Sequence, residues 1–93
     1  MGYVFEWDSR KERENARKHR VSFAEATTVF GDPRSLRMDD PDHSQDEMRY
    51  LLLGVSIRDR VLVVAFVERH SRVRLISARR ATRRERSQHE EET

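Results

Sequence analysis

Arginines crowd the stretch RVRLISARRATRRER, which runs from Arg72 to Arg86. An apolar segment, Val73 to Ala78, ends at a run that holds five arginines and one glutamate, a local charge of +4. Guanidinium groups are planar and can bind phosphate through two parallel hydrogen bonds. The pattern therefore indicates either a solvated charged helix or a surface that receives phosphate.

Charge elsewhere in the chain is unevenly placed. Of 93 residues, 39% are charged and 35% are hydrophobic, which predicts one domain, residues 1–93, with a thin core. Seventeen of the 19 basic residues are arginine, a bias that suits nucleic acid but that GC-rich coding also produces. Net charge is only +2, because the acidic segment Asp39–Glu47 offsets the basic C-terminal part.

Several classes of protein are disfavoured by composition. The chain has no cysteine, so disulfides and thiolate metal sites are excluded. No segment approaches the roughly 18 to 20 apolar residues of a membrane span, and the N-terminus does not resemble a signal peptide. We therefore expect a cytoplasmic protein.

The N-terminal third predicts a strand and two helices. Alternation over Tyr3–Trp7 indicates a short strand, and Asp8 is a suitable N-cap for a helix over Ser9–His19 that has almost no apolar face. Ser22 and Glu25 form a capping box, in which each side chain caps the other's backbone N–H, at the start of a second helix. Residues at helical spacing in it should face the core, namely Phe23, Ala26, Thr27 and Phe30.

The remaining chain predicts strands. Two apolar segments, Arg49–Ile57 and Arg60–Arg69, indicate a β-hairpin, and Arg72–Ala78 should pair next to it. Arg34–Met38 could add an edge strand. The order predicts an α+β domain: a mostly antiparallel four- to five-stranded sheet, two helices packed on one face, and a charged C-terminal helix.

That last helix has no hydrophobic residue from Thr82 onward. Thr82 and Glu85 form a second capping box, and Arg79, Arg83 and Arg86 have the spacing of one helical face. Because it can bury little, this helix should be ordered by ion pairs, a partner or RNA, and its last residues should fray.

Four segments together resemble the BrnT toxins of bacterial toxin–antitoxin pairs: FEWDSRKERENARKHRVSF, VFGDP, DPDHS and ERHSRVRLISARRATRRER. They span Phe5 to about Glu90. The resemblance implies a RelE-like ribonuclease fold and RNA cleavage that arrests translation, with no cofactor and no membrane. It also implies a BrnA-like antitoxin in a 2:2 heterotetramer, whose ribbon-helix-helix domain alone contacts operator DNA.

Two positions depart from the family pattern. Arg20 stands where glycine commonly follows the Lys-His pair, and a left-handed helix end costs an arginine roughly 1 kcal/mol. We therefore expect this helix to end differently. His89 stands where an aromatic residue is common and should stack or anchor less well.

RNA cleavage without a metal needs the 2′-OH in line with the phosphorus, proton transfer, and charge stabilisation. Arg79, in the ISAR signature, and Arg49 are candidates for holding the phosphate, although Arg79 could instead pair with Glu85 or the acidic loop. The side chains able to move protons are His19, Glu47, Tyr50, Glu68 and His70. The predicted catalytic set is Arg79, Glu68, His19 and Arg49.

RNA contacts are predicted on three elements. Lys11, Asn15 and His19 form a polar stripe on the first helix, although His19 could instead bond the last helical carbonyls. Trp7 could stack a base, with anchoring of the core as its more common role. Glu68 and Arg69 must point to opposite faces, and Glu68 could pair with Arg49 or Arg74. The predicted RNA contacts are Trp7, Lys11, Asn15, Arg69, Arg74, Arg83 and Arg86.

The acidic segment does not predict a metal site. Asp40, Asp42, His43 and Asp46 do not match the spacing of a calcium loop, and an acidic rim that meets an antitoxin arginine fits better. Two other function classes stay open. One is a non-catalytic nucleic-acid-binding module, and the other is an interaction module whose arginine helix docks an acidic partner.

Overall fold

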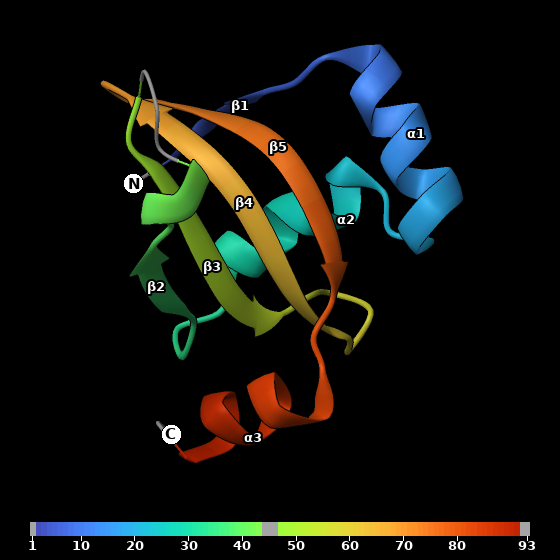
Figure 1. The fold of residues 1–93 in the computed structure, drawn as a ribbon, viewed down its shortest axis with the longest axis vertical. Helices are drawn as coiled ribbons and strands as arrows, with labels where there is room; N and C mark the ends of the chain where they lie inside the picture. The colour runs from blue at the N-terminus through green and yellow to red at the C-terminus, as the bar shows by residue number, and fades with distance from the viewer. Residues whose placement is uncertain (1, 44–46, 92–93) are drawn as a thin grey trace.

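Five strands form one sheet in the order β1-β5-β4-β3-β2, in a computed structural model that describes residues 2–43 and 47–91 (Figure 1). β1 pairs with β5 in parallel, and every other neighbouring pair is antiparallel, which confirms the predicted α+β sheet. The strands are β1 Val4–Glu6, β2 Leu36–Asp39, β3 Arg49–Val55, β4 Val61–Arg69 and β5 Arg72–Arg80.

Three α-helices of the described residues pack around this sheet. They are α1 Ser9–His19, α2 Phe23–Thr28 and α3 Arg83–Glu91, with 3-10 turns η1 Val29–Gly31 and η2 Pro41–His43. Figure 1 shows α2 behind β4 and β5, α1 beside β5, and α3 beyond the ends of β3 and β5. No helix of the described residues is long and apolar enough to cross a membrane.

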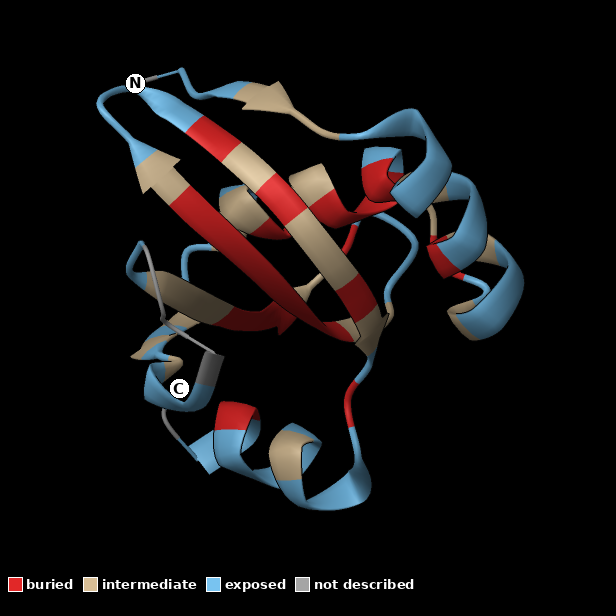
Figure 2. Ribbon diagram, turned by 45° about the horizontal axis from the view of Figure 1, so that its top comes forward, coloured by how far each residue is buried: buried red, intermediate tan, exposed pale blue. Residues whose placement is uncertain are grey.

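The main core lies between the sheet and α2, on what we call the α2 face. Val21, Phe23, Ala26 and Val29 are fully buried there. The sheet contributes Leu52, Leu62, Val64, Phe66, Val73, Leu75 and Ala78. Figure 2 shows β4 buried along most of its length, as the apolar character of both its faces predicted.

The opposite side of the sheet, the open face, has a smaller apolar cluster. Leu53, Val63 and Ala81 are buried in it near the start of α3. Partly buried residues pack around them, namely Leu36, Met38, Leu51 and Val61. The rest of the open face is therefore available for polar side chains.

A β-bulge at Ile76 decides which β5 side chains reach the open face. Ala65 pairs with Ser77 and Phe66 with Leu75, so Ile76 has no partner on β4. The extra residue shifts the alternation by one position. As a result Arg74 and Arg79 lie on the same face, although they are five positions apart in the sequence.

The caps of the first two helices agree in part with those predicted from the sequence. Asp8 caps α1 by accepting from the backbone N–H groups of Arg10 and Lys11. Ser22 Oγ accepts from Glu25 N at 3.0 Å, as predicted. The second predicted bond of that capping box, from Ser22 N–H to the Glu25 side chain, is wrong. The Glu25 carboxylate instead accepts from Ser56 and Arg60, in and beside the β3–β4 turn.

The expectation that α1 ends differently at Arg20 is also wrong. Arg20 has the left-handed conformation, with φ 59° and ψ 32°, and its N–H donates to Ala16 O. Its carbonyl accepts from the Arg60 guanidinium at 3.0 Å. The backbone therefore keeps the geometry that glycine would adopt without strain.

The C-terminal helix is held by polar contacts. Thr82 and Glu85 form the predicted reciprocal capping box, and buried His89 contacts Asp32, so His89 does anchor the helix. The predicted helical face shared by Arg79, Arg83 and Arg86 is wrong, because Arg79 belongs to β5. The final turn was expected to fray, but α3 is helical as far as Glu91, and residues 92 and 93 lie outside the described residues.

Candidate nucleic-acid interface

A hollow of about 250 Å³ lies on the open face, between two arginines. Leu51, Ala65 and Ser77 stand side by side across β3, β4 and β5 and form its floor. The residues around them are Asp40, Arg49, Val63 and Arg79. A mostly apolar floor with an arginine on each side suits a nucleotide, whose base is flat and whose phosphate is anionic.

The arginines of the open face are already close to carboxylates. Arg49 and Arg74 flank Val67 in one row across the sheet. Arg74 pairs with Glu6 at 3.3 Å, and the predicted RNA contact Arg69 pairs with Glu47. Such partly exposed pairs contribute about 0 to 1 kcal/mol each, so a phosphate could replace the carboxylate at little cost.

Arg79 makes the best ordered of these contacts. Its Nη1 and Nη2 donate to Oε1 and Oε2 of Glu85 at 2.9 and 3.0 Å, and Nη1 also donates to the Arg80 carbonyl at 3.2 Å. The hydrogen bond from Arg79 lowers the pKa of Glu85 from 4.5 to about 2. The ion pair with Glu85 is thus present, and phosphate binding by Arg79 stays a prediction.

A second hollow, of about 210 Å³, lies between α1 and β5. Lys11 and His19, both predicted from the polar stripe, line it together with Ser77, which also borders the first hollow. The other lining residues are Glu14, Asn15, Lys18 and Ile76. The two hollows therefore adjoin across β5.

The side chain of Asn15 is hydrogen-bonded to the backbone. Its amide nitrogen donates to Val21 O at 3.0 Å and Ala78 O at 2.8 Å, and its oxygen accepts from Ala78 N at 3.0 Å. The residue is only 7% exposed. Asn15 therefore fastens α1 to β5, and this geometry argues against the predicted direct contact with RNA.

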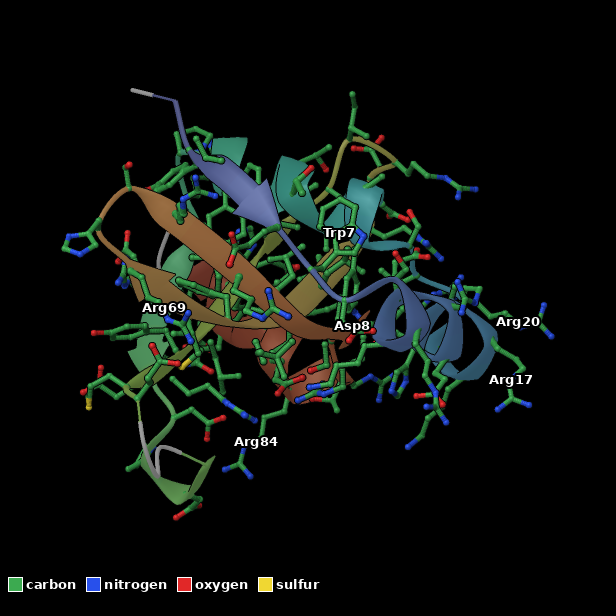
Figure 3. The ribbon with its side chains drawn as sticks, turned by 90° about the horizontal axis from the view of Figure 1, so that it is seen from above. Trp7, Asp8, Arg17, Arg20, Arg69 and Arg84 are labelled. Carbon is green, nitrogen blue, oxygen red and sulfur yellow. The ribbon has the colours of Figure 1, made fainter. Side chains whose placement is uncertain are left out.

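Trp7 also serves the core. Its ring meets that of Phe23 edge-on, with centroids 5.9 Å apart, and packs against the main core. Figure 3 shows Trp7 on the side of the sheet where α2 lies. The anchoring alternative describes Trp7 better than stacking on a base.

Glu68 lies apart from the other candidate catalytic residues. It shares the α2 face with Phe66 and pairs with Arg37, so the predicted salt bridge to Arg49 or Arg74 is wrong. Arg37, which sequence reasoning missed, also lies 4.3 Å above the Tyr50 ring. The sheet therefore separates Glu68 from the hollow at Arg79.

The arginines of α3 differ in whether they form hydrogen bonds or ion pairs. Arg86, a predicted RNA contact, donates to Ala81 O at 3.2 Å. Arg83, also predicted, and Arg84 are exposed and have no ion-pair partner among residues 2–43 and 47–91. Figure 3 shows Arg84 reaching out on the side opposite α2. Sequence reasoning did not single out Arg84.

Two comparisons with known proteins agree with this arrangement. Residues 7–85 match the family described as "Ribonuclease toxin, BrnT, of type II toxin-antitoxin system". The fold is similar to the crystal structure of the Brucella abortus ribonuclease toxin BrnT, with a TM-score of 0.64 and 21% identity over 88% of this chain and 100% of that chain. No curated protein matches the sequence significantly. This chain therefore belongs to the BrnT family of ribonuclease toxins of type II toxin–antitoxin systems.

Proposed function

We propose that this chain is an endoribonuclease that cleaves RNA over the hollow between Arg49 and Arg79 without a metal. Cleavage of messenger RNA would then inhibit translation. The observation that carries the proposal is the pair of arginines, one on β3 and one on β5, that line the same hollow on the open face. Membership of a family named for ribonuclease toxins supports the reaction class.

In the proposed reaction, Arg79 and Arg49 hold the scissile phosphate and stabilise the charge that develops on it. Attack by the neighbouring 2′-OH needs a base, and the proton-transfer candidate that lines the second hollow together with Ser77 is His19. The same imidazole, once protonated, would give the proton to the leaving 5′-oxygen, so that a 2′,3′-cyclic phosphate and a 5′-hydroxyl are formed. Lys11 would hold the adjoining nucleotide in the second hollow. Glu68 has no part in this proposal, because it faces the other side of the sheet.

The proposed RNA path continues along the basic side chains that border the open face. Arg74 and Arg69 extend it toward one end of β5, and Arg83, Arg84 and Arg86 extend it onto α3. Each phosphate contact should make binding weaker as salt rises, because bound counterions are released.

A type II system implies an antitoxin, and we propose a BrnA-like protein with a ribbon-helix-helix domain as the partner in a 2:2 heterotetramer. Operator DNA would be bound by the antitoxin alone. Size-exclusion chromatography with light scattering, on the two proteins together and apart, would test this stoichiometry.

The ribonuclease proposal is tested by incubating purified protein with an in vitro transcribed messenger RNA in EDTA, beside induction of the same variants in cells. Cleavage should persist in EDTA, and Arg49→Ala and Arg79→Ala should each reduce it about 100- to 1,000-fold, as loss of a charge-stabilising donor does elsewhere. The control is Arg58→Ala, at an exposed arginine of the β3–β4 turn.

Two results would contradict the proposal. Cleavage that requires added Mg²⁺ would exclude the metal-independent reaction. RNA binding that falls steeply with salt, without any cleavage or growth arrest, would instead indicate a non-catalytic binding module.

A further inference from the structure

We infer that Glu85 is a positioning residue, which holds the Arg79 guanidinium so that one edge of it remains to grip a phosphate. The inference rests on the proposed function, in which Arg79 binds the scissile phosphate. It assigns a role to a carboxylate that would otherwise only compete with RNA for the same arginine.

The argument begins with the donors of Arg79. A guanidinium has five N–H groups. Nη1 uses two, toward Glu85 Oε1 and the Arg80 carbonyl, and Nη2 uses one, toward Glu85 Oε2. The two N–H groups that have no partner among the described residues, on Nε and Nη2, lie parallel along the same edge of the group. That edge is the fork that binds two phosphate oxygens at once.

Glu85 is itself held firmly. Its Oε1 also accepts from Thr82 N at 2.8 Å, and its own N–H donates to Thr82 Oγ1 at 3.2 Å. The other end of α3 is fixed by His89, whose Nε2 lies 3.0 Å from Asp32. The guanidinium on β5 is therefore oriented by the first turn of a helix that is anchored at both ends.

The negative charge on Glu85 predicts opposite effects on RNA binding and on the cleavage rate when it is removed. Its pKa of about 2 keeps it ionised at neutral pH, so it reduces the positive charge that attracts RNA. Removing this charge while keeping the shape should leave RNA binding equal or stronger. The cleavage rate should fall, because Arg79 is no longer held in place.

Two variants separate this role from capping of the helix. Glu85→Gln keeps the capping box, since glutamine serves at that position, but loses the ionic grip on Arg79. Thr82→Ala removes the hydroxyl cap and leaves the Arg79–Glu85 contact. Thermal unfolding of both variants would confirm that each is folded.

The experiment measures kcat and KM on an in vitro transcribed messenger RNA in EDTA. We expect Glu85→Gln to lower kcat about 10- to 100-fold, as misplacement of a catalytic group does, with KM unchanged or lower. Thr82→Ala should keep kcat within about twofold of the wild-type value, because Arg79 stays in position.

A double-mutant cycle completes the test. If Glu85 acts through Arg79, adding Glu85→Gln to Arg79→Ala should cause no further loss. The inference is overturned if Glu85→Gln keeps the wild-type kcat, if it lowers kcat further in the Arg79→Ala background, or if Thr82→Ala loses as much. Normal cleavage by Arg79→Ala would instead contradict the placement of phosphate in the proposed function.

Discussion

The imidazole Nε2 of His89 lies 3.0 Å from Oδ2 of Asp32, and this contact joins α3 to the loop after η1. Both side chains are nearly buried, with 7% and 10% exposed. Burial acts to raise the pKa of Asp32, but hydrogen bonds from the N–H groups of Val55 and Arg34 and from His89 hold that pKa below 3.8. A helix with little apolar surface is thus attached through one buried polar contact.

We expect His89→Ala to lower the free energy of unfolding by about 1 to 3 kcal/mol, because a buried oxygen of Asp32 loses a partner. Amide hydrogen exchange should show a loss of protection in α3 while β4 stays protected. Gln88→Ala, at the exposed neighbouring position, is the control. Unchanged exchange in α3 would mean that other contacts hold the helix.

Gly54 should tolerate no side chain. A Cβ atom there would lie 2.9 Å from Asp32 Oδ2 and 3.0 Å from atoms of Ser35 and Val29. Gly54→Ala should therefore cost about 1 to 3 kcal/mol in urea unfolding. Gly31→Ala, where a Cβ meets nothing within 4 Å, should be unchanged or up to about 1 kcal/mol more stable. Equal stability of the two variants would show that the loop at Asp32 moves to make room for the added methyl group.

The Glu85 carboxylate should make stability depend on pH. The hydrogen bond from Arg79 lowers its pKa to about 2 from 4.5, so its contribution is complete above pH 4.5 and is lost as pH falls toward 2. Relative to Glu85→Gln, the wild-type protein should be more stable by up to about 1 kcal/mol at neutral pH, since Arg79 is 40% exposed.

That difference should vanish near pH 2, as measured by urea unfolding across a pH series. Glu14→Gln is the matched control, because the one ion pair of Glu14 with a described residue is an exposed contact with Arg10 at 3.8 Å. It should change the free energy of unfolding by less than about 0.5 kcal/mol. A constant gap between wild type and Glu85→Gln at all pH values would argue against the ion pair as its source.

Arg20→Gly should stabilise the chain by up to about 1 kcal/mol, because Arg20 has a φ of 59° that glycine adopts without strain. Arg17→Gly, in the regular part of α1, should instead destabilise it by about 1 kcal/mol. Figure 3 shows both side chains pointing away from the protein, so their loss should not disturb packing. Thermal melting compares the two, and a lower melting temperature for Arg20→Gly would refute the strain argument.

The features predicted correctly from the sequence depend on neighbours in the chain. The N-cap at Asp8, the start of α2 at Ser22 and the capping box at Thr82 each need residues only two or three positions away. The hairpin was predicted as well, although Asp59, with a φ of 61°, takes a left-handed conformation that glycine adopts more readily. Fold class followed from the order of these elements.

The contacts that sequence reasoning missed join distant positions. Glu25 bonds Ser56 and Arg60, which depends on where α2 packs, and Glu68 bonds Arg37, which depends on how the strands are ordered in the sheet. Seventeen arginines offer many partners to each carboxylate, so charge alone cannot choose among them. The candidate site was predicted in part: Arg49, Arg79, Lys11 and His19 border the two hollows, whereas Trp7 and Glu68 lie elsewhere.

The bulge at Ile76 has a consequence for how this strand is compared between relatives. With strict alternation from Arg74, Ala78 would reach the open face and Arg79 would enter the core. A relative that lacks the extra residue would therefore need its cation one position earlier to place it beside the same hollow. Alignments of β5 should open a gap at Ile76, and deletion of Ile76 alone should keep Arg74 and Arg79 on the same face, because it restores strict alternation.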